Sequence, residues 1–275
     1  MPTIEHQLTE IYVFVDDYLK AHAELANWRR SPHAHPAFTD AEVITVALMQ
    51  GCLGCESLKK TYTLMAENFR SAFPSLPSYT QWIARLHALS EIVGRLVFAC
   101  CALGWVRLYI LDSKPVPVCK SIRNGRVRLL REDGACFGKS STGWFFGFKL
   151  HVIIDMDGCI LTALLLPANT QDRHAAEALA EIVDGGIGLG DHGYLGAAFK
   201  DDLAEATELL MVTPKDAGTR RSLISTVRER VETVFSQLWA RFVDRIHSRS
   251  WLGLWNTIKL KLLHYNLVTA GLLTV

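Results

Sequence analysis

The sequence lacks the apolar segments and leader features that would place the protein in a membrane or export it. No apolar run reaches the about 18 residues of a membrane-spanning helix, and the C-terminal segment 254–275 is interrupted by Lys259, Lys261 and His264. The N-terminus carries acidic residues where a signal peptide is basic, and it has no small-residue cleavage site. We therefore expect a cytoplasmic protein with no membrane partner, in which the C-terminal segment forms a core helix.

The sequence also lacks a complete zinc-binding or disulfide pattern. Its seven cysteines are odd in number and scattered. Cys52 and Cys55 in "CLGC" have the spacing of half a zinc site, and His33 and His35 lie upstream, but the second ligand pair of a structural zinc site is missing. A zinc site and reduced cysteines in a helical core are both open interpretations, and the pattern favours the second.

The net charge of +1 conceals a strong asymmetry along the chain. Residues 101–150 carry nine Lys and Arg against three Asp and Glu, and residues 214–275 carry ten against four. The segment between them, 151–213, carries two against eleven. Basic blocks suit a surface that binds a polyanion, because neutralised phosphates release their counterions. They also occur as ordinary solvated faces, so charge alone does not decide between these interpretations.

The first hundred residues show helical spacing. In "FTDAEVITVALMQ", Thr39 is a good helix N-cap and Glu42 completes a capping box. A second helix follows the Pro- and Ser-rich stretch "FPSLPSYTQW" and carries Arg85. This pattern predicts either a helix-turn-helix that reads DNA or part of a helical bundle. We predict that residues 1–104 form an all-helical N-terminal domain that binds DNA.

After residue 104 the pattern changes to apolar strands followed by alternating helices and strands. "YILD", "WFFGFKLHVII" and "CILTALLL" predict strands, and a turn at 155–158 joins the last two. Residues 119–143 are basic and rich in Gly and Ser, which predicts a long loop or insertion. The order is that of a ribonuclease-H-like mixed sheet with flanking helices, so we predict an α/β domain over residues 105–275 with a basic insertion near 119–143.

Two predicted strands end on an aspartate, Asp112 in "YILD" and Asp191 in "IGLGD". Active sites of open α/β sheets gather at the carboxyl ends of strands, so neighbouring strands bring such carboxylates together. Two carboxylates about 4 Å apart repel by roughly 4 kcal/mol at an effective dielectric near 20, and a divalent cation between them removes this cost. Carboxylate oxygens are the ligands that Mg²⁺ or Mn²⁺ prefers.

A third acid is expected from the long helix that contains "VRERVETVFSQL". Glu232 lies at the edge of its apolar face and Arg228 shares that side, whereas Glu229 points to solvent. Taken singly, each acid is explained as a turn residue after a strand or as a solvated side chain. Three acids at matched positions between basic segments favour a metal site made of Asp112, Asp191 and Glu232.

Several motifs resemble known transposases in order and spacing. "YILDSKPVPVCKSIR", "FFGFKLHVIIDMDG", "GDHGYLG" and "RERVETVFSQL" are similar to the catalytic core of bacterial insertion-sequence transposases of the Asp-Asp-Glu (DDE) class. "FTDAEVITVALMQ" and "FPSLPSYTQW" also resemble the N-terminal region of insertion-sequence family 982, the family to which the similarity is greatest. The resemblance covers nearly the whole chain and implies DNA cleavage and strand transfer at the terminal inverted repeats of an insertion sequence.

The resemblance also implies a catalytic site and its partners. Asp112, Asp191 and Glu232 would be catalytic and hold two Mg²⁺ or Mn²⁺ ions per active site, with Asp112 bridging both ions in two-metal phosphoryl transfer. The partners would be double-stranded DNA, as terminal repeats and target, and other copies of the chain in a homodimer or larger DNA-bound assembly at the nucleoid. Two alternatives remain, a metal-dependent nuclease without strand transfer and a non-catalytic DNA-binding regulator derived from a transposase.

Basic side chains near these acids are candidates for phosphate contacts, and two further residues are candidates for lining the site. The basic candidates are Lys114, Lys120, Arg123, Arg126, Lys149, Arg228 and Arg230. His151 and Tyr194 are the candidates for lining, although a core histidine and a packed tyrosine explain them equally well.

Overall fold

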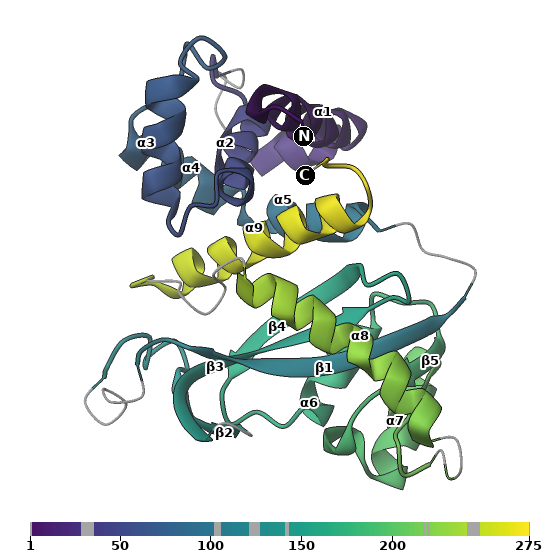
Figure 1. Ribbon diagram of the computed structural model, residues 1–275. Coiled ribbons are helices and arrows are strands. Elements are labelled where there is room, and N and C mark those ends of the chain that lie inside the picture. The colour runs from purple at the N-terminus through teal and green to yellow at the C-terminus, as the bar shows by residue number, and fades with distance from the viewer. Residues whose placement is uncertain are drawn as a thin grey trace. The chain divides into compact units, whose positions relative to one another are not determined.

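The computed structural model divides the chain into two compact units (Figure 1). The first contains Met1–Cys100, Arg245–Ser248 and Leu252–Val275, and the second contains Cys101–Asp244 and Arg249–Trp251. The described residues are 2–28, 36–101, 106–120, 127–140, 143–216, 218, 221–240 and 248–274. Within these ranges, no helix is both long enough and apolar enough to cross a membrane.

The first unit is helical. Its elements are α1 (Ile4–Ala21), the 3₁₀ helix η1 (Ala23–Trp28), α2 (Asp40–Cys52), α3 (Leu58–Asn68), α4 (Tyr79–Ala88), α5 (Ser90–Ala99) and most of α9 (Trp251–Thr269). The predicted capping box begins α2: the Glu42 N–H donates to the Thr39 hydroxyl at 3.2 Å, and the Thr39 N–H donates to the Glu42 carboxylate. Each contact satisfies a backbone donor that the first helical turn leaves without an intrahelical partner.

The C-terminal helix α9 belongs to the first unit, whereas the sequence led us to expect it in a domain spanning 105–275. The helix is buried from Asn256 to Leu267. Asn256 donates to the Leu86 carbonyl at 2.9 Å and Asn266 to the Val97 carbonyl at 2.8 Å. The expected core helix is therefore present, but its buried polar groups pair with α4 and α5, which its apolar pattern does not reveal.

The helical unit favours the bundle interpretation over a helix-turn-helix at α3 and α4. Residues 69–78 connect these two helices, a longer connection than the turn of a helix-turn-helix. Arg85 forms an ion pair with Asp40 at 2.9 Å, and its guanidinium lies 5.8 Å from the Phe38 ring. Arg85 is thus held within the unit, and DNA binding by residues 1–104 stays a prediction.

The second unit is a mixed α/β fold with a six-stranded sheet and flanking helices, consistent with a ribonuclease-H-like domain. Its strands are β1 (Leu108–Pro117), β2 (Cys136–Ser140), β3 (Gly143–Ile154), β4 (Ile160–Pro167), β5 (Gly186–Leu189) and β6 (Leu209–Val212). Its helices are α6 (Arg173–Ala180), the 3₁₀ helix η3 (His192–Tyr194), α7 (Ala197–Thr207) and α8 (Arg221–Ala240).

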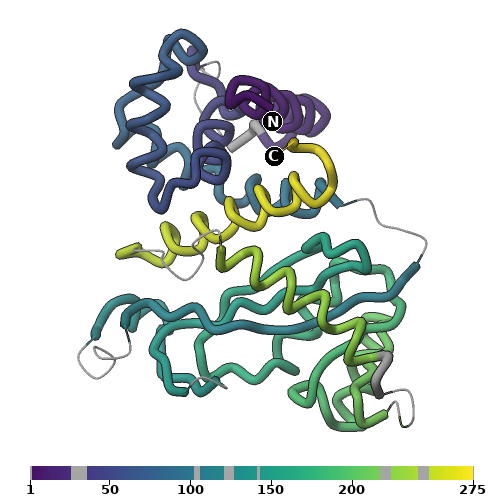
Figure 2. Tube along the Cα trace, in the orientation of Figure 1, coloured from purple at the N-terminus to yellow at the C-terminus, as the bar shows by residue number. Residues whose placement is uncertain are grey.

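Strand β1 is central to this sheet, and its path can be followed in Figure 2. It pairs antiparallel with β3 on one side and parallel with β5 on the other, and β5 pairs parallel with β6. The outer edge of β3 is shared by β2 and β4. The predicted turn joins β3 to β4, where the Asp155 carboxylate accepts from the N–H groups of Asp157 at 2.9 Å and Cys159 at 2.8 Å. Side-chain acceptance of this kind is what makes aspartate a turn residue.

Strand β2 lies inside the segment 119–143, which was predicted to be a loop or insertion. The loop prediction is therefore wrong for Cys136–Ser140, while residues 121–126 and 141–142 lie outside the described residues. Gly138 sits at the middle of this strand, and a Cβ there would lie 2.4 Å from the Ala168 carbonyl oxygen. Close packing at this position requires glycine, but glycine is a poor strand former. Gly138 therefore weakens the sequence pattern by which this strand could have been predicted.

Helices α8 and α6 cover opposite faces of the sheet at β1 (Figure 1). Arg228 of α8 contacts Asp112, and Lys114 lies over the rings of Phe235 and Trp239 on the same helix. Ser113, between them, instead donates to Asp172 just before α6. Successive strand residues point to opposite faces, so these contacts assign one helix to each face.

Two helical glycines provide a stability test of the first unit. A Cβ on Gly51 of α2 would lie 2.2 Å from the ring of His264 in α9, whereas a Cβ on Gly94 of α5 would meet only Lys259, at 3.5 Å. We expect Gly51→Ala to lower the free energy of unfolding by about 1–3 kcal/mol through overpacking. Gly94→Ala should raise it by about 0.5–1 kcal/mol through helix propensity. Urea unfolding of both variants checks this, and equal effects of the two substitutions would contradict the packing of α9 on α2.

Candidate active site

The aspartates Asp112 and Asp191 occupy equivalent positions on neighbouring parallel strands. β1 and β5 stay paired as far as Ile110 and Leu189, and each aspartate follows two residues later. β5 ends there while β1 continues, so the edge of β1 beside Asp112 is left open to groups from both faces of the sheet. The prediction that this strand ends on Asp112 is wrong, because β1 runs on to Pro117, but the register still places Asp112 beside the end of β5, which Asp191 follows.

The surroundings of Asp112 disfavour the ionised form of its carboxyl group. Its side chain is 18% exposed. Burial raises the pKa of Asp112 to about 6, the Ser113 N–H and the Arg228 guanidinium oppose this shift, and the charges of Asp191 and Asp172 add to it. The Ser113 N–H donates at 2.8 Å, and Arg228 Nη2 lies 3.6 Å from Asp112 Oδ2. The fold thus concentrates negative charge here beyond what its nearby cation neutralises.

On helix α8, Glu232 lies one turn beyond Arg228, on the same side of the helix. Arg228 lies by Asp112, and Trp239 lies 4.9 Å below the Lys114 ammonium. Glu232 falls between them on the same helical stripe, in an exposed position, whereas Glu229 lies about a quarter turn away from Arg228. Contacts on both sides of Glu232 therefore direct this part of the helix toward the open edge of β1.

Asp172, which sequence reasoning did not identify, joins the same cluster. It precedes α6 at the N-cap position but makes no capping hydrogen bond. Its Oδ1 instead accepts from Ser113 Oγ at 2.7 Å and from Lys149 Nζ at 3.4 Å, and it lies 3.6 Å from His151 Nδ1. An aspartate before a helix is normally explained as a cap, and that ordinary explanation concealed this residue.

His151 and Tyr194 are both fully buried beside these acids. Burial lowers the pKa of His151 to about 4, against the opposing charge of Asp172. Burial raises the pKa of Tyr194 well above its ordinary value, and the charges of Asp172, Asp112 and Asp191 raise it further. Neither the Tyr194 hydroxyl nor the His151 ring nitrogens have a hydrogen-bond partner among the described residues. The Tyr194 hydroxyl is therefore a buried donor held within range of three carboxylates.

The predicted phosphate-contacting residues divide into exposed and anchored groups. Lys120 and Arg230 are exposed, while Lys149 is anchored by Asp172 and the Thr170 carbonyl. Arg123 and Arg126 lie outside the described residues.

A second exposed surface lies on the β2–β3 hairpin. Lys139 faces its cross-strand partner Trp144, which is 63% exposed, and Phe137 is 41% exposed on the same strand. Cationic and aromatic side chains together are typical of surfaces that contact nucleic acids. Neither Lys139 nor these rings was identified from the sequence, because this segment was expected to be a loop.

The donor chemistry of the cluster fits a hard divalent cation. Asp112, Asp191 and Asp172 supply carboxylate oxygens, the ligands that Mg²⁺ and Mn²⁺ prefer, and the Tyr194 hydroxyl offers a hydrogen-bond partner for a bound water. In the part of the chain that the structure describes, no group of three or more His, Cys, Asp or Glu side chains is placed so that it could hold a metal ion.

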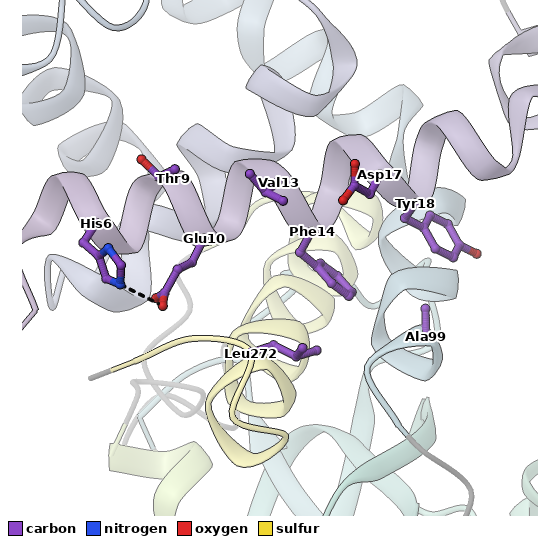
Figure 3. Close-up of a pocket in the computed structure, with 9 residues that line it drawn as sticks. All are labelled: His6, Thr9, Glu10, Val13, Phe14, Asp17, Tyr18, Ala99 and Leu272. Atoms are coloured by element: carbon purple, nitrogen blue, oxygen red, sulfur yellow. Dashed lines mark ion pairs between the residues drawn. The ribbon is translucent and has the colours of Figure 1, made fainter.

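A separate hollow of about 580 Å³ lies along α1 in the helical unit (Figure 3). Its lining is mainly apolar, with Val13, Phe14 and Leu272, and its polar contact is an ion pair of His6 and Glu10 at 3.1 Å. None of the clustered aspartates lines it, so it offers no comparable site for chemistry on an anionic substrate.

Comparison with known proteins identifies one family. The family model described as "Transposase DDE domain" matches residues 105–249, which contain the whole acidic cluster and α8. No curated protein and no solved structure matches the chain.

The raised pKa of Asp112 predicts a pH dependence of stability. The folded state holds this proton more tightly than the unfolded state between about pH 4 and pH 6, so stability falls as pH rises through that window. Asp112→Asn cannot titrate. Its free energy of unfolding relative to wild type should therefore increase by about 1–3 kcal/mol from pH 4 to pH 7. Urea unfolding in chelator at several pH values measures this, and a difference that is constant with pH would contradict it.

Proposed function

Because the chain belongs to the transposase DDE domain family, we propose that it cleaves DNA at the ends of an insertion sequence and joins those ends to a target. Its similarity to insertion-sequence family 982 rests on the sequence motifs and is part of this proposal. The observation that carries the proposal is the register of β1 and β5, in which Asp112 and Asp191 each lie two residues beyond the last paired residues, Ile110 and Leu189. Glu232 is assigned as the third acid because it lies one helical turn beyond Arg228, which contacts Asp112.

The proposed catalytic residues are Asp112, Asp191 and Glu232, holding two Mg²⁺ or Mn²⁺ ions. When bound, the ions activate a water or DNA hydroxyl nucleophile and stabilise the leaving oxygen. Arg228 limits the charge repulsion around Asp112 before metal and DNA arrive. Burial of the site strengthens these electrostatic interactions, which supply much of the rate enhancement in such chemistry.

The DNA-binding surface is proposed to include the exposed basic residues around this site. Lys120 precedes the basic segment that contains Arg123 and Arg126, and Arg230 lies exposed on α8. The Lys114 ammonium is held over the rings of Phe235 and Trp239, so we propose that it contacts a DNA phosphate from this fixed position. The substrate is then double-stranded DNA bound by a dimer or larger assembly, which presents both element ends.

Removal of the proposed catalytic carboxylates tests this function. Asp112→Asn, Asp191→Asn and Glu232→Gln should each reduce cleavage and joining at least about a thousandfold, because each removes a ligand of the ions. The assay uses DNA containing both flanks of the gene, with Mg²⁺ or Mn²⁺. Glu229→Gln is the matched control, since it alters the neighbouring carboxylate that lies farther from the apolar face of the same helix, and it should stay within about threefold of wild type.

Each alternative gives a distinct result in this assay. Full activity of Asp112→Asn would contradict the catalytic assignment. If Glu229→Gln loses activity while Glu232→Gln keeps it, the third metal ligand is Glu229 and not Glu232. Cleavage without joining, even when 3′-hydroxyl ends are supplied, would identify a nuclease. DNA binding by the wild type without cleavage in any ion would identify a regulator.

Exposed and anchored basic residues should differ in DNA binding. Lys120→Ala and Arg230→Ala should each weaken binding and lower the slope of log affinity against log salt by about 1, because each releases fewer counterions. Lys149→Ala should leave this slope unchanged, because Lys149 is held by Asp172. Fluorescence anisotropy at several salt concentrations measures the slopes, and equal slopes for all three variants would argue against this division.

A further inference from the structure

The two carboxylate oxygens of Asp172 have different surroundings. Oδ1 carries all of its described contacts, accepting from Ser113 Oγ at 2.7 Å and Lys149 Nζ at 3.4 Å and lying 3.6 Å from His151 Nδ1. Ser113, Lys149 and His151 lie on the α6 face of β1 and β3, where Ser113 and His151 are cross-strand partners. These contacts fix the carboxylate in place and leave Oδ2 turned away from them.

Oδ2 of Asp172 and Oδ1 of Asp191 lie close to the same point beside Gly193. A Cβ on Gly193 would lie 2.7 Å from Asp172 Oδ2 and 2.9 Å from Asp191 Oδ1. These two oxygens can therefore be no farther apart than the sum of those distances. Oxygen ligands lie about 2.0–2.1 Å from Mg²⁺, so a small side-chain rotation is enough for one ion to bind both. Gly193 keeps the space between the two carboxylates free of a side chain.

The Tyr194 hydroxyl gives an independent indication that a ligand belongs in this space. The side chain is 0% exposed and its hydroxyl has no hydrogen-bond partner among the described residues. The charges of Asp172, Asp112 and Asp191 all act on this hydroxyl. A buried hydroxyl without a partner is costly, and a water molecule carried by a bound cation would donate a hydrogen bond to its oxygen.

The charge balance of the cluster favours the binding of a cation. Asp112 is paired with Arg228 and Asp172 with Lys149, while the described hydrogen bond of Asp191 is from the Gly193 N–H at 2.7 Å. Among the described residues, these three carboxylates thus have two side-chain cations as partners. A divalent ion between Asp191 and Asp172 neutralises the excess where it is greatest.

We propose that Asp172 is a further metal ligand, which binds through Oδ2 the same divalent cation as Asp191. This proposal rests on the proposed function, since it assigns a fourth carboxylate to the same site. Ser113 and Lys149 act as positioning residues, because they hold Oδ1 and so aim Oδ2 at the ion. The rival role for Asp172 is purely structural, holding Lys149 and Ser113 without touching a metal.

Metal binding to the full-length protein without DNA separates these roles. Mn²⁺ binding is measured by the loss of the free-ion electron paramagnetic resonance signal, for wild type, Asp172→Asn and Asp184→Asn. Asp172→Asn should weaken Mn²⁺ binding about tenfold or more, as loss of a ligand does. Asp184, a 90% exposed carboxylate of the same unit, is the control, and its variant should bind as wild type does. Unchanged Mn²⁺ binding in Asp172→Asn overturns the proposal.

A thiol at the same position distinguishes a ligand from a positioning residue. Asp172→Cys should bind Cd²⁺ at least about tenfold more tightly relative to Mn²⁺ than wild type does, because a thiolate prefers a soft ion. A structural carboxylate predicts no change in this ratio, and that result overturns the proposal even if Asp172→Asn folds poorly. Circular dichroism reports whether each variant folds.

The same variants separate this proposal from the proposed function. If the wild type cleaves DNA and both Asp172 variants bind metal ions and cleave DNA as the wild type does, Asp172 is not a metal ligand and the proposed function stands. If the wild type cleaves no DNA but Asp172→Asn loses Mn²⁺ and Asp172→Cys gains Cd²⁺ preference, the ligand stands and the function fails.

Discussion

The structure depends on the burial of one carboxylate, Asp112, at the point where β5 ends and β1 continues. Its cost is expressed in a pKa raised to about 6, because burial and the neighbouring Asp191 and Asp172 outweigh Arg228 and the Ser113 N–H. A fold selected for stability alone has no reason to gather acids in this way. The arrangement is reasonable when a divalent cation completes it, and the family assignment of residues 105–249 agrees with that interpretation.

The site is assembled from both faces of the sheet because β1 has an open edge beside Asp112. On the face covered by α8, that helix contributes Arg228 and, one turn later, Glu232. On the face covered by α6, Asp172 contacts Ser113 and Lys149. Asp191 is the N-cap of η3, and Tyr194 at the end of this 3₁₀ helix is buried. Residues far apart in the sequence thus meet through two simple rules, the alternation of strand side chains and the parallel register of β1 and β5.

The sequence predicted the strand order, the capping box at Thr39, the β3–β4 turn and the matched positions of Asp112 and Asp191. These features depend on local patterns and on topology. It did not predict β2, because Gly138 is required by packing against Ala168 and weakens the strand signal. Asp172 was missed because an acid before a helix looks like a cap, and the partners that recruit it lie on two other strands. The association of α9 with the first unit depends on hydrogen bonds to α4 and α5 that apolar periodicity does not encode.

We propose that Asp112, within β1, and Asp191, just after β5, hold divalent cations for DNA chemistry. A crystal of the full-length protein bound to DNA and soaked in Mn²⁺, measured at the manganese absorption edge, tests this most directly. The account predicts anomalous peaks within about 2–2.6 Å of carboxylate oxygens of Asp112 and Asp191. Manganese bound only elsewhere, with the two aspartates free of it in the presence of DNA, would contradict the account.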